Sequence, residues 1–135
     1  IHPMGNGKPL GKDVLEQLIP GLQNHPTTII FLAFHEKKAV GIVTCFKGFS
    51  TFMARPTISI SDFYVQPDCQ GKKIGQKLLI MVEKKAIELN CCKITLEVQA
   101  NNKKALRIYK AAGFAPDLHV KEAGAALFFS KPLSD

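Results

Sequence analysis

Metal-binding and redox motifs are missing from the sequence. Its four cysteines form no Cys-x-x-Cys pair, and its four histidines are too scattered to complete a zinc site. Cys91 and Cys92 are adjacent and cannot easily bridge each other, so we expect buried or idle thiols in a reducing compartment. The sequence therefore predicts no metal and no redox role.

Long hydrophobic runs are also missing. The longest nearly uncharged segments, residues 27–34 and 39–46, have the length of a strand and fall far short of a membrane span. No basic start followed by an apolar stretch and a small-residue cleavage site precedes them, so no secretion signal is indicated. We expect a soluble, cytoplasmic protein.

Acidic residues are few compared with basic ones, eleven against eighteen, which gives a net charge of +7. The entire excess lies in residues 71–110, which contain ten basic and three acidic side chains. Such a local excess predicts an anionic partner, although a solvated face of two lysine-rich helices would give the same pattern. Nucleic acid is the less favoured partner, because few aromatic residues lie among the lysines and no Cys/His finger occurs.

The remaining composition is that of a globular protein. The chain has 135 residues, of which 46% are hydrophobic and 21% are charged, and this length suits one compact domain. Residues 1–10 are rich in glycine and proline and are predicted to be a lead-in. No repeat, linker or change of composition divides the rest, so residues 11–135 are predicted to form a single domain.

Hydrophobic periodicity predicts an alternation of strands and helices. A strand–helix–strand succession between Thr57 and Val98 predicts a parallel pair joined by a crossover, beside strands connected by hairpins. Around Asp62 the alternation of the strand breaks, as it does at a β-bulge. The result is an α/β fold with a mixed sheet covered by helices. The predicted strands cover residues 27–34, 39–46, 57–65, 94–98 and 125–129, and the predicted helices cover residues 12–22, 74–89 and 103–112.

A candidate phosphate-binding turn follows the strand at 57–65. The turn contains Gly71, and the next helix opens at about Lys73. The first turn of a helix has unpaired N–H groups and a partial positive charge, so it attracts phosphate. Gly75 costs about 1 kcal/mol relative to alanine inside a helix, which indicates a packing or binding reason for it. The segment is neither a Walker loop nor Gly-x-Gly-x-x-Gly, and an ordinary strand–helix turn would look the same.

A second motif, Asn-x-x-Ala-x-x-x-Tyr-x-x-x-Gly-Phe, spans residues 102–114 directly after a predicted strand. Asn102 is a natural helix N-cap, and Gly113 is a natural stop. Ala105 and Tyr109 are four residues apart and share a helix face, so Tyr109 could point toward the strand ends. The alternative for Tyr109 is a core aromatic whose hydroxyl is satisfied.

The two motifs, in this order, resemble those of the GNAT superfamily of N-acetyltransferases, and the match runs from Ile58 to Phe114. Residues 70–75, Gln-Gly-Lys-Lys-Ile-Gly, are similar to the family's acetyl-CoA pyrophosphate loop, Gln/Arg-x-x-Gly-x-Gly/Ala. The resemblance implies a mixed, mostly antiparallel central sheet, with helices on both faces and a parallel strand pair splayed at a bulge. It also implies transfer of an acetyl group from acetyl-CoA to the primary amine of a small molecule or protein, by direct attack and without a metal.

The resemblance also assigns roles to individual residues. The backbone of residues 63–65 would pair with the pantetheine arm and stabilise the oxyanion, and the amides of residues 71–76 would hold the pyrophosphate. Asn102 would help to position the arm, and a lysine of the loop or of the 103–104 pair would meet the other phosphate. Tyr109 would be the general acid that protonates the departing thiolate. The implied cofactor-binding residues are Phe63, Tyr64, Val65, Gln70, Gly71, Lys72, Lys73, Ile74, Gly75, Gln76, Asn102, Lys104 and Ala105.

The general base is left open between two carboxylates. Related enzymes often carry a glutamate on the strand before the loop, where this sequence has Ser59 and Ser61. Asp62 is the nearest carboxylate and the first candidate, directly or through a water, and Glu97 on the adjacent strand is the second. The alternatives are that Asp62 hydrogen-bonds backbone at the bulge and that Glu97 pairs with a lysine. Many members of the family have no dedicated base.

Two features depart from the family pattern. Lys73 replaces the middle glycine of the loop, and the chain begins almost at a helix where the family has a strand. Lys73, together with the missing glutamate on the strand before the loop, makes a non-catalytic CoA-binding or regulatory module of the same fold the main alternative function. The resemblance leaves the amine acceptor open, and dimerisation through the C-terminal strands is common in the family.

Overall fold

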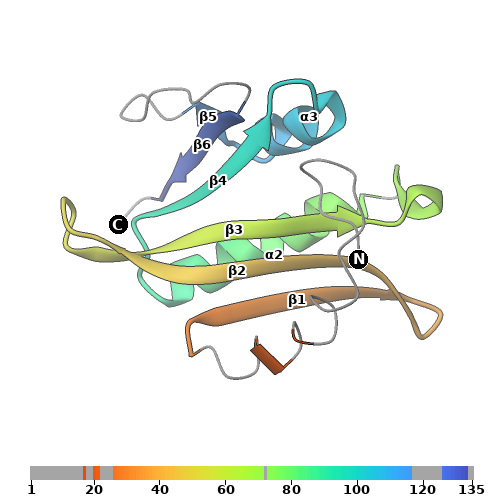
Figure 1. The fold of residues 1–135 in the computed structure, drawn as a ribbon, viewed down its shortest axis with the longest axis horizontal. Coiled ribbons are helices and arrows are strands. Elements are labelled where there is room, and N and C mark those ends of the chain that lie inside the picture. Colours follow the sequence, from red (N-terminus) through yellow and green to blue (C-terminus); the bar gives the residue numbers. More distant parts are fainter. Residues whose placement is uncertain (1–16, 18–19, 22–25, 72, 117–125, 134–135) are drawn as a thin grey trace.

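In the residues that the structure describes, a six-stranded mixed sheet packs with the α-helices α2 and α3 (Figure 1). The computed structural model describes residues 17, 20–21, 26–71, 73–116 and 126–133. The strand order across the sheet is β1-β2-β3-β4-β6-β5. The strands are β1 (Thr28–His35), β2 (Lys38–Ser50), β3 (Arg55–Val65), β4 (Lys93–Gln99), β5 (Ala115–Pro116) and β6 (Ala126–Pro132); the helices are α2 (Ile74–Glu88) and α3 (Lys103–Ala111), and a short 3₁₀ helix, η1 (Pro67–Cys69), precedes α2.

Most strand pairs are antiparallel, as predicted. The exception is the pair formed by β3 and β4, which are parallel because α2 connects them. Their ladder runs from Thr57 opposite Lys93 to Ile60 opposite Leu96. The two-residue strand β5, which pairs with β6, was not predicted, because so short a segment has no hydrophobic period of its own.

The predicted bulge in β3 is confirmed. Thr44 of β2 lies opposite Asp62, and the next residue of β2, Cys45, lies opposite Ile60, so Ser61 is an extra residue in β3. The ladder with β4 ends at this level, although β3 continues to Val65. Beyond Ile60 the two strands diverge toward the end of the sheet where α3 begins (Figure 1).

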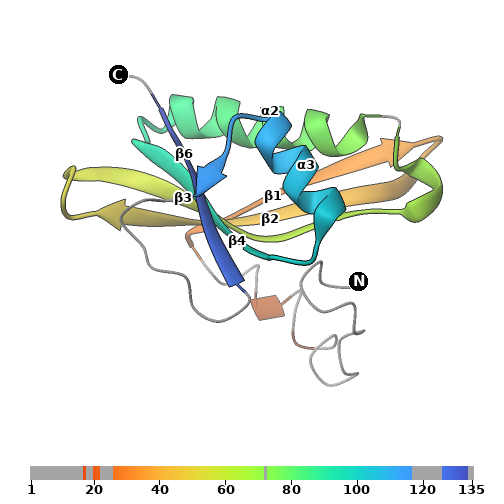
Figure 2. The ribbon, with the colours of Figure 1, turned by 90° about the horizontal axis from the view of Figure 1, so that it is seen from above.

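Both described helices lie on one face of the sheet (Figure 2). Leu78 and Val82 of α2 belong to the same buried cluster as Tyr109 of α3 and Ile58 and Ile94 of the parallel strands. Burying these side chains against the sheet is the main force that holds the helices in place. Helices were expected on both faces, and the third predicted helix, at residues 12–22, has only 17 and 20–21 among the described residues.

The C-terminus of α2 is fixed to the start of the parallel strands. Asn90 adopts a left-handed backbone (φ 62°), and the N–H of Cys91 donates back to the Ala86 carbonyl at 2.9 Å, a Schellman closure. The Arg55 guanidinium donates to the Asn90 Oδ1 at 3.1 Å and to the Cys91 carbonyl at 3.2 Å. These bonds join the first residue of β3 to the turn that leads into β4.

Some predictions lie outside the described residues. These are the lead-in at 1–10, most of the helix at 12–22, and Lys72 of the phosphate turn. The last predicted strand, 125–129, is observed as β6 with a later end. No helix in the described ranges has the length and apolar character needed to cross a bilayer.

Deletion of Ser61 should keep the fold and remove the bulge. The deletion makes Asp62 follow Ile60 directly, which restores a regular ladder with Thr44 and Cys45 and leaves each buried residue on its face. We expect the β3–β4 ladder to extend, so that amides of β4 beyond Leu96 gain protection in hydrogen exchange.

Deletion of Ser59 is the matched control. It places Ile58 next to Ile60, so one of two buried isoleucines must leave the core, at a cost of about 2 kcal/mol or more. Denaturant melts compare the two deletions, and an equal loss of stability in both would contradict the position of the bulge at Ser61.

Candidate active site

The turn before α2 has the backbone that its glycine predicts. Gly71 has φ 89°, and Lys73, the residue before the helix, has φ 63°. Both angles lie in the left-handed region, which glycine adopts freely and which costs a lysine about 1–2 kcal/mol. The left-handed backbone at position 73 therefore suits the glycine that the family motif has there. Lys73 adopts the same backbone conformation at a cost in conformational energy.

The first turn of α2 presents amides that precede the hydrogen bonds of the helix itself. The first helical bond of α2 joins the N–H of Lys77 to the Lys73 carbonyl at 3.1 Å, so the N–H groups of Ile74, Gly75 and Gln76 precede it. Together with the helix dipole these amides form a site for an anion.

Gly75 lets α2 approach β3 and α3 closely. A Cβ at this position would lie 3.0 Å from Cζ of Phe63 and 3.8 Å from Cδ1 of Ile108. The packing reason predicted for this glycine is therefore present: the start of α2, the end of β3 and the middle of α3 meet around it.

Two polar side chains join the phosphate turn to α3. The Lys104 ammonium donates to Oε1 of Gln70 at 3.3 Å, and Nε2 of Gln70 donates to the Val65 carbonyl at 3.1 Å. The first turn of α3 thus places a cation beside the turn that follows β3. The structure brings together three of the residues that the sequence assigned to cofactor binding.

Both ends of α3 have the caps that the sequence predicts. Oδ1 of Asn102 accepts a hydrogen bond from the Ala105 N–H at 3.2 Å. At the other end Gly113 (φ 95°) closes a Schellman motif, in which the Phe114 N–H donates to the Tyr109 carbonyl at 2.9 Å. The Phe114 ring meets the Tyr109 ring edge-on, with centroids 5.9 Å apart. The cap and this ring contact fix the turn of α3 that carries Tyr109.

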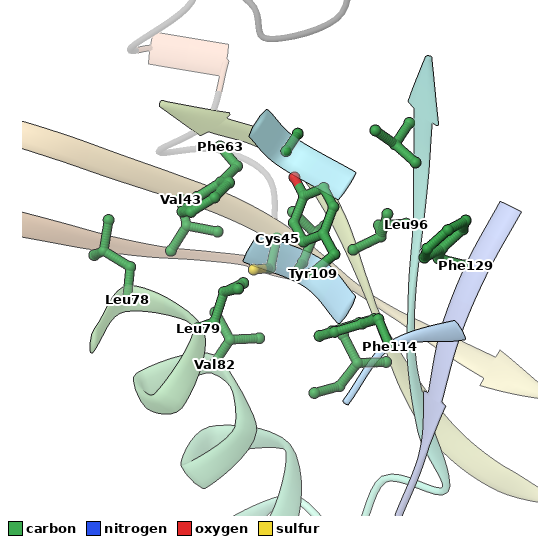
Figure 3. Packing of buried hydrophobic residues seen from close by; sticks show 14 of the residues in the cluster. Val43, Cys45, Phe63, Leu78, Leu79, Val82, Leu96, Tyr109, Phe114 and Phe129 are labelled. Carbon is green, nitrogen blue, oxygen red and sulfur yellow. The ribbon is translucent and has the colours of Figure 1, made fainter. Parts of the chain in front are cut away.

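The Tyr109 ring stands beside the point where β3 and β4 diverge. It is 4% exposed, and its centroid lies 5.6 Å from that of Phe63. Figure 3 shows the phenol oxygen pointing away from Phe114 and Val82, alongside Phe63. The ring therefore belongs to the core, while its hydroxyl lies toward the opening between β3 and β4, which begins beyond the last pair of their ladder, Ile60 and Leu96.

The Tyr109 hydroxyl is held in its protonated form. Burial raises the pKa of the phenol well above its ordinary value, and the nearby Cys45 adds to this rise only where its own thiol ionises, at high pH. Burial also raises the pKa of Cys45, to about 12, so this neighbour stays neutral. Within the described residues the Tyr109 hydroxyl makes no hydrogen bond. The one side-chain polar atom there that is both fully buried and without a partner is Thr28 Oγ1, so the oxygen of Tyr109 is not fully buried. The phenol oxygen therefore keeps some access to solvent.

The two candidate bases lie on the other face of the sheet. Ile60 and Phe63 of β3 are buried under the helices, and the bulge turns Ser61 and Asp62 away from them. Burial raises the pKa of the Asp62 carboxyl, which makes it a better proton acceptor than an exposed aspartate. Glu97 is exposed and follows Leu96, the last residue of the ladder, on that same face. Asp62 and Glu97 thus flank the opening between β3 and β4.

Some contacts of the site were not predicted. Cys45 of β2 belongs to the same buried cluster as Tyr109 and acts electrostatically on its phenol. No spacing in the sequence connects residues so far apart. Phe114 was part of the second motif, but its contact with the Tyr109 ring follows only from the Schellman cap. In the described part of the chain no three His, Cys, Asp or Glu side chains are grouped to hold a metal ion.

Comparison with known proteins decides the family. The profile of the GNAT acetyltransferase family matches residues 6–114. The chain belongs to the GNAT family. Curated relatives include a thialysine N-epsilon-acetyltransferase of Bos taurus, 37% identical over 79 residues that make up 58% of this chain and 45% of that protein. Another is the N-alpha-acetyltransferase MAK3 of Arabidopsis thaliana, 34% identical over 86 residues, or 64% of this chain and 44% of the relative.

Solved structures show the same GNAT fold. The PaiA N-acetyltransferase of Thermoplasma acidophilum, in complex with coenzyme A, superposes with a TM-score of 0.74 at 20% identity, over 91% of this chain and 72% of that one. PH1933 of Pyrococcus horikoshii OT3 gives a TM-score of 0.67 at 30% identity, over 78% of this chain and 65% of that one. The chain spans less than half the length of the two curated relatives named above.

The burial of Tyr109 predicts a loss of stability in alkali. The unfolded phenol ionises at its ordinary pKa of 10.0, and the folded one ionises only at higher pH. Its contribution to the free energy of unfolding is therefore complete below pH 10.0 and falls as the pH rises above it. Denaturant melts of the wild type and of Tyr109→Phe on both sides of this pH measure the effect. The buried Cys45 thiol, whose pKa is raised from 9.0, weakens both proteins in alkali, so the wild type should lose more stability than the variant.

A spectroscopic control isolates the group. The chain has two tyrosines and no tryptophan, so in a Tyr64→Phe background the ultraviolet absorbance of tyrosinate reports Tyr109 alone. Ionisation of Tyr109 at its ordinary pKa in the folded protein would contradict its burial.

Proposed function

We propose that the protein transfers the acetyl group of acetyl-CoA to a primary amine, by direct attack of the amine on the thioester. The observation that carries this proposal is the position of Tyr109 at the end of the ladder between β3 and β4, beside Phe63, which itself packs against Gly75 in the first turn of α2. Membership of the GNAT family supports it, and the PaiA relative of the same fold was solved with coenzyme A.

The phosphates of acetyl-CoA bind at the start of α2. The N–H groups that precede the first helical bond donate hydrogen bonds to the pyrophosphate oxygens, and Gly71 allows the pyrophosphate to approach the backbone. Lys104 reaches the same turn through Gln70, so its ammonium supplies charge to a phosphate. Lys73 adds a second cation, and Lys72, assigned to the same role from the sequence, lies outside the described residues.

The pantetheine arm and the thioester occupy the opening of the sheet. The edge of β3 at Phe63 and Val65, beyond the last pair with β4, offers backbone groups that can bond the amides of the arm. When the amine nitrogen attacks, the carbonyl oxygen becomes an oxyanion, and a backbone N–H of this strand stabilises it. The start of α3, capped by Asn102, lines the other side of the arm.

Each proton has a donor and an acceptor. The ammonium form of the amine loses a proton to Asp62, directly or through a water, and Glu97 is the second candidate. The nitrogen then forms its bond to the acetyl carbon, and the positively charged nitrogen of the adduct gives its second proton to water. As the carbon–sulfur bond breaks, Tyr109 gives its proton to the sulfur and CoA leaves as the thiol. Solvent returns a proton to Tyr109.

The acceptor is proposed to be a cationic amine. Asp62 and Glu97 flank the opening on the face away from Tyr109, where they attract an ammonium group. One curated relative is named for the ε-amine of thialysine, and the other is named for an α-amine, so both small-molecule and protein amines are tested. A cytoplasmic location and a homodimer stay predictions.

Replacing the phenol of Tyr109 tests the proposed acid. Tyr109→Phe should lower kcat about 100-fold or more, since a general acid contributes that much, while the Kd of acetyl-CoA changes little. Release of thiol from acetyl-CoA, measured across a panel of diamines and peptides, gives kcat, and calorimetry gives Kd. Unchanged turnover would remove the acid role.

A variant of the phosphate turn should instead remove the binding of acetyl-CoA. Gly71→Glu places bulk and negative charge where the pyrophosphate binds, so calorimetry should detect no acetyl-CoA binding. Retained affinity would contradict the site. If the wild type binds acetyl-CoA but releases no thiol with any amine, the protein is the non-catalytic CoA-binding module.

The proposed base predicts a pH dependence. Since a base must be deprotonated, kcat/KM for the amine should rise as the pH passes through the raised pKa of Asp62. Asp62→Asn should remove that rise and lower kcat/KM at neutral pH. The exposed Asp68→Asn is the matched control and should behave as the wild type. If Glu97→Gln abolishes the rise instead, Glu97 is the base.

A further inference from the structure

Lys131, near the end of β6, joins three elements through one ammonium group. Its Nζ lies 2.8 Å from Oε2 of Glu83 on α2 and donates to the Ala112 carbonyl, the C-cap of α3, at 2.7 Å. Both charged side chains are partly buried, with 22% and 34% of their surface exposed. No step of the proposed function uses these residues.

The contact with α3 is made at the turn that carries Tyr109. Ala112 lies between Tyr109 and Gly113, and the Phe114 N–H bonds to the Tyr109 carbonyl in the same Schellman motif. The last carbonyls of a helix have no partner inside the helix, and a cation there also complements the helix dipole. Lys131 therefore fixes the end of α3 from outside, while Asn102 fixes its start.

Gly113 provides room for this contact. A Cβ on Gly113 would lie 3.1 Å from Cε and 3.3 Å from Nζ of Lys131. The glycine thus serves two purposes, because its left-handed backbone ends the helix and its missing side chain admits the lysine.

The ion pair with Glu83 has the geometry of a strong interaction. The N–O distance of 2.8 Å is that of a charge-assisted hydrogen bond, and partial burial limits screening by salt. The exposed pair Lys85–Glu88 on the same helix is longer, at 3.5 Å, and its carboxylate is 70% exposed. A surface pair of that kind contributes little, so it serves as a control.

We propose that Lys131 is a positioning residue that holds α3 against α2, so that the Tyr109 hydroxyl stays at the opening between β3 and β4. Glu83 takes part by holding the ammonium from the side of α2. An effect of Lys131 on catalysis rests on the proposed role of Tyr109 as general acid. The effect of Lys131 on the position of Tyr109 does not depend on that role.

The first test measures Tyr109 without any substrate. In the Tyr64→Phe background, Lys131→Met should lower the pH at which Tyr109 ionises, because a loosened α3 lets water reach the phenol. Lys85→Met in that background should leave the titration unchanged. Glu83→Gln, which keeps a hydrogen-bond acceptor and loses the charge, should give a smaller change in the same direction.

The second test measures turnover. Lys131→Met should lower kcat about tenfold or more, as expected when a reacting group is displaced, and should change KM for acetyl-CoA less than about twofold. Lys131→Arg keeps the charge and should recover part of the loss. Unchanged kcat and unchanged Tyr109 titration in folded Lys131→Met would overturn the proposal.

The outcomes separate this proposal from the proposed function. If Tyr109→Phe retains full turnover, the acid role is wrong, and the shift of the Tyr109 titration still decides the positioning by Lys131. If Lys131→Met does not fold, Glu83→Gln decides: an unshifted titration with wild-type kcat would overturn the proposal.

Discussion

The site depends on one extra residue in the backbone of β3, Ser61. Up to Ile60 the strand shares a ladder with β4, and beyond it β3 remains paired with β2 while β4 remains paired with β6. Backbone groups on the two facing edges then require partners other than a strand. A bulge bends the strand that carries it and increases the local twist, so the edges separate. The opening that acetyl-CoA would enter is therefore a property of the backbone register.

The same residue decides which side chains face each side of the sheet. In a regular strand Asp62 would share a face with Ile60 and point into the core, and Phe63 would point away from it. With Ser61 inserted, Phe63 lies against Tyr109 and Asp62 lies on the opposite face. A carboxylate beside the buried phenol would be costly to desolvate. The bulge thus separates the proposed base from the proposed acid while keeping both beside the opening.

Local features of this structure were predictable, and contacts between distant segments were not. The broken alternation at Asp62 predicted the bulge, and Asn102 and Gly113 predicted both ends of α3, because these signals depend on a few neighbouring residues. That Cys45 and Tyr109 share one buried cluster depends on how the sheet and helix pack, which no local pattern encodes. Lys131 illustrates the same limit, since its partner Glu83 lies 48 residues away.

Burial of Tyr109 has opposite effects on the two requirements of a general acid. A raised pKa keeps the phenol protonated before the reaction, and it also makes the proton harder to give up. Transfer depends on the difference between the pKa values of donor and acceptor, however, and the thiolate of CoA would form in the same poorly solvated opening. Desolvation disfavours the thiolate as it disfavours the phenolate, so the pKa of the thiol rises as well. Where the phenol oxygen and the sulfur share one poorly solvated opening, the pKa values of Tyr109 and of the CoA thiol therefore lie closer together than the shift of Tyr109 alone indicates.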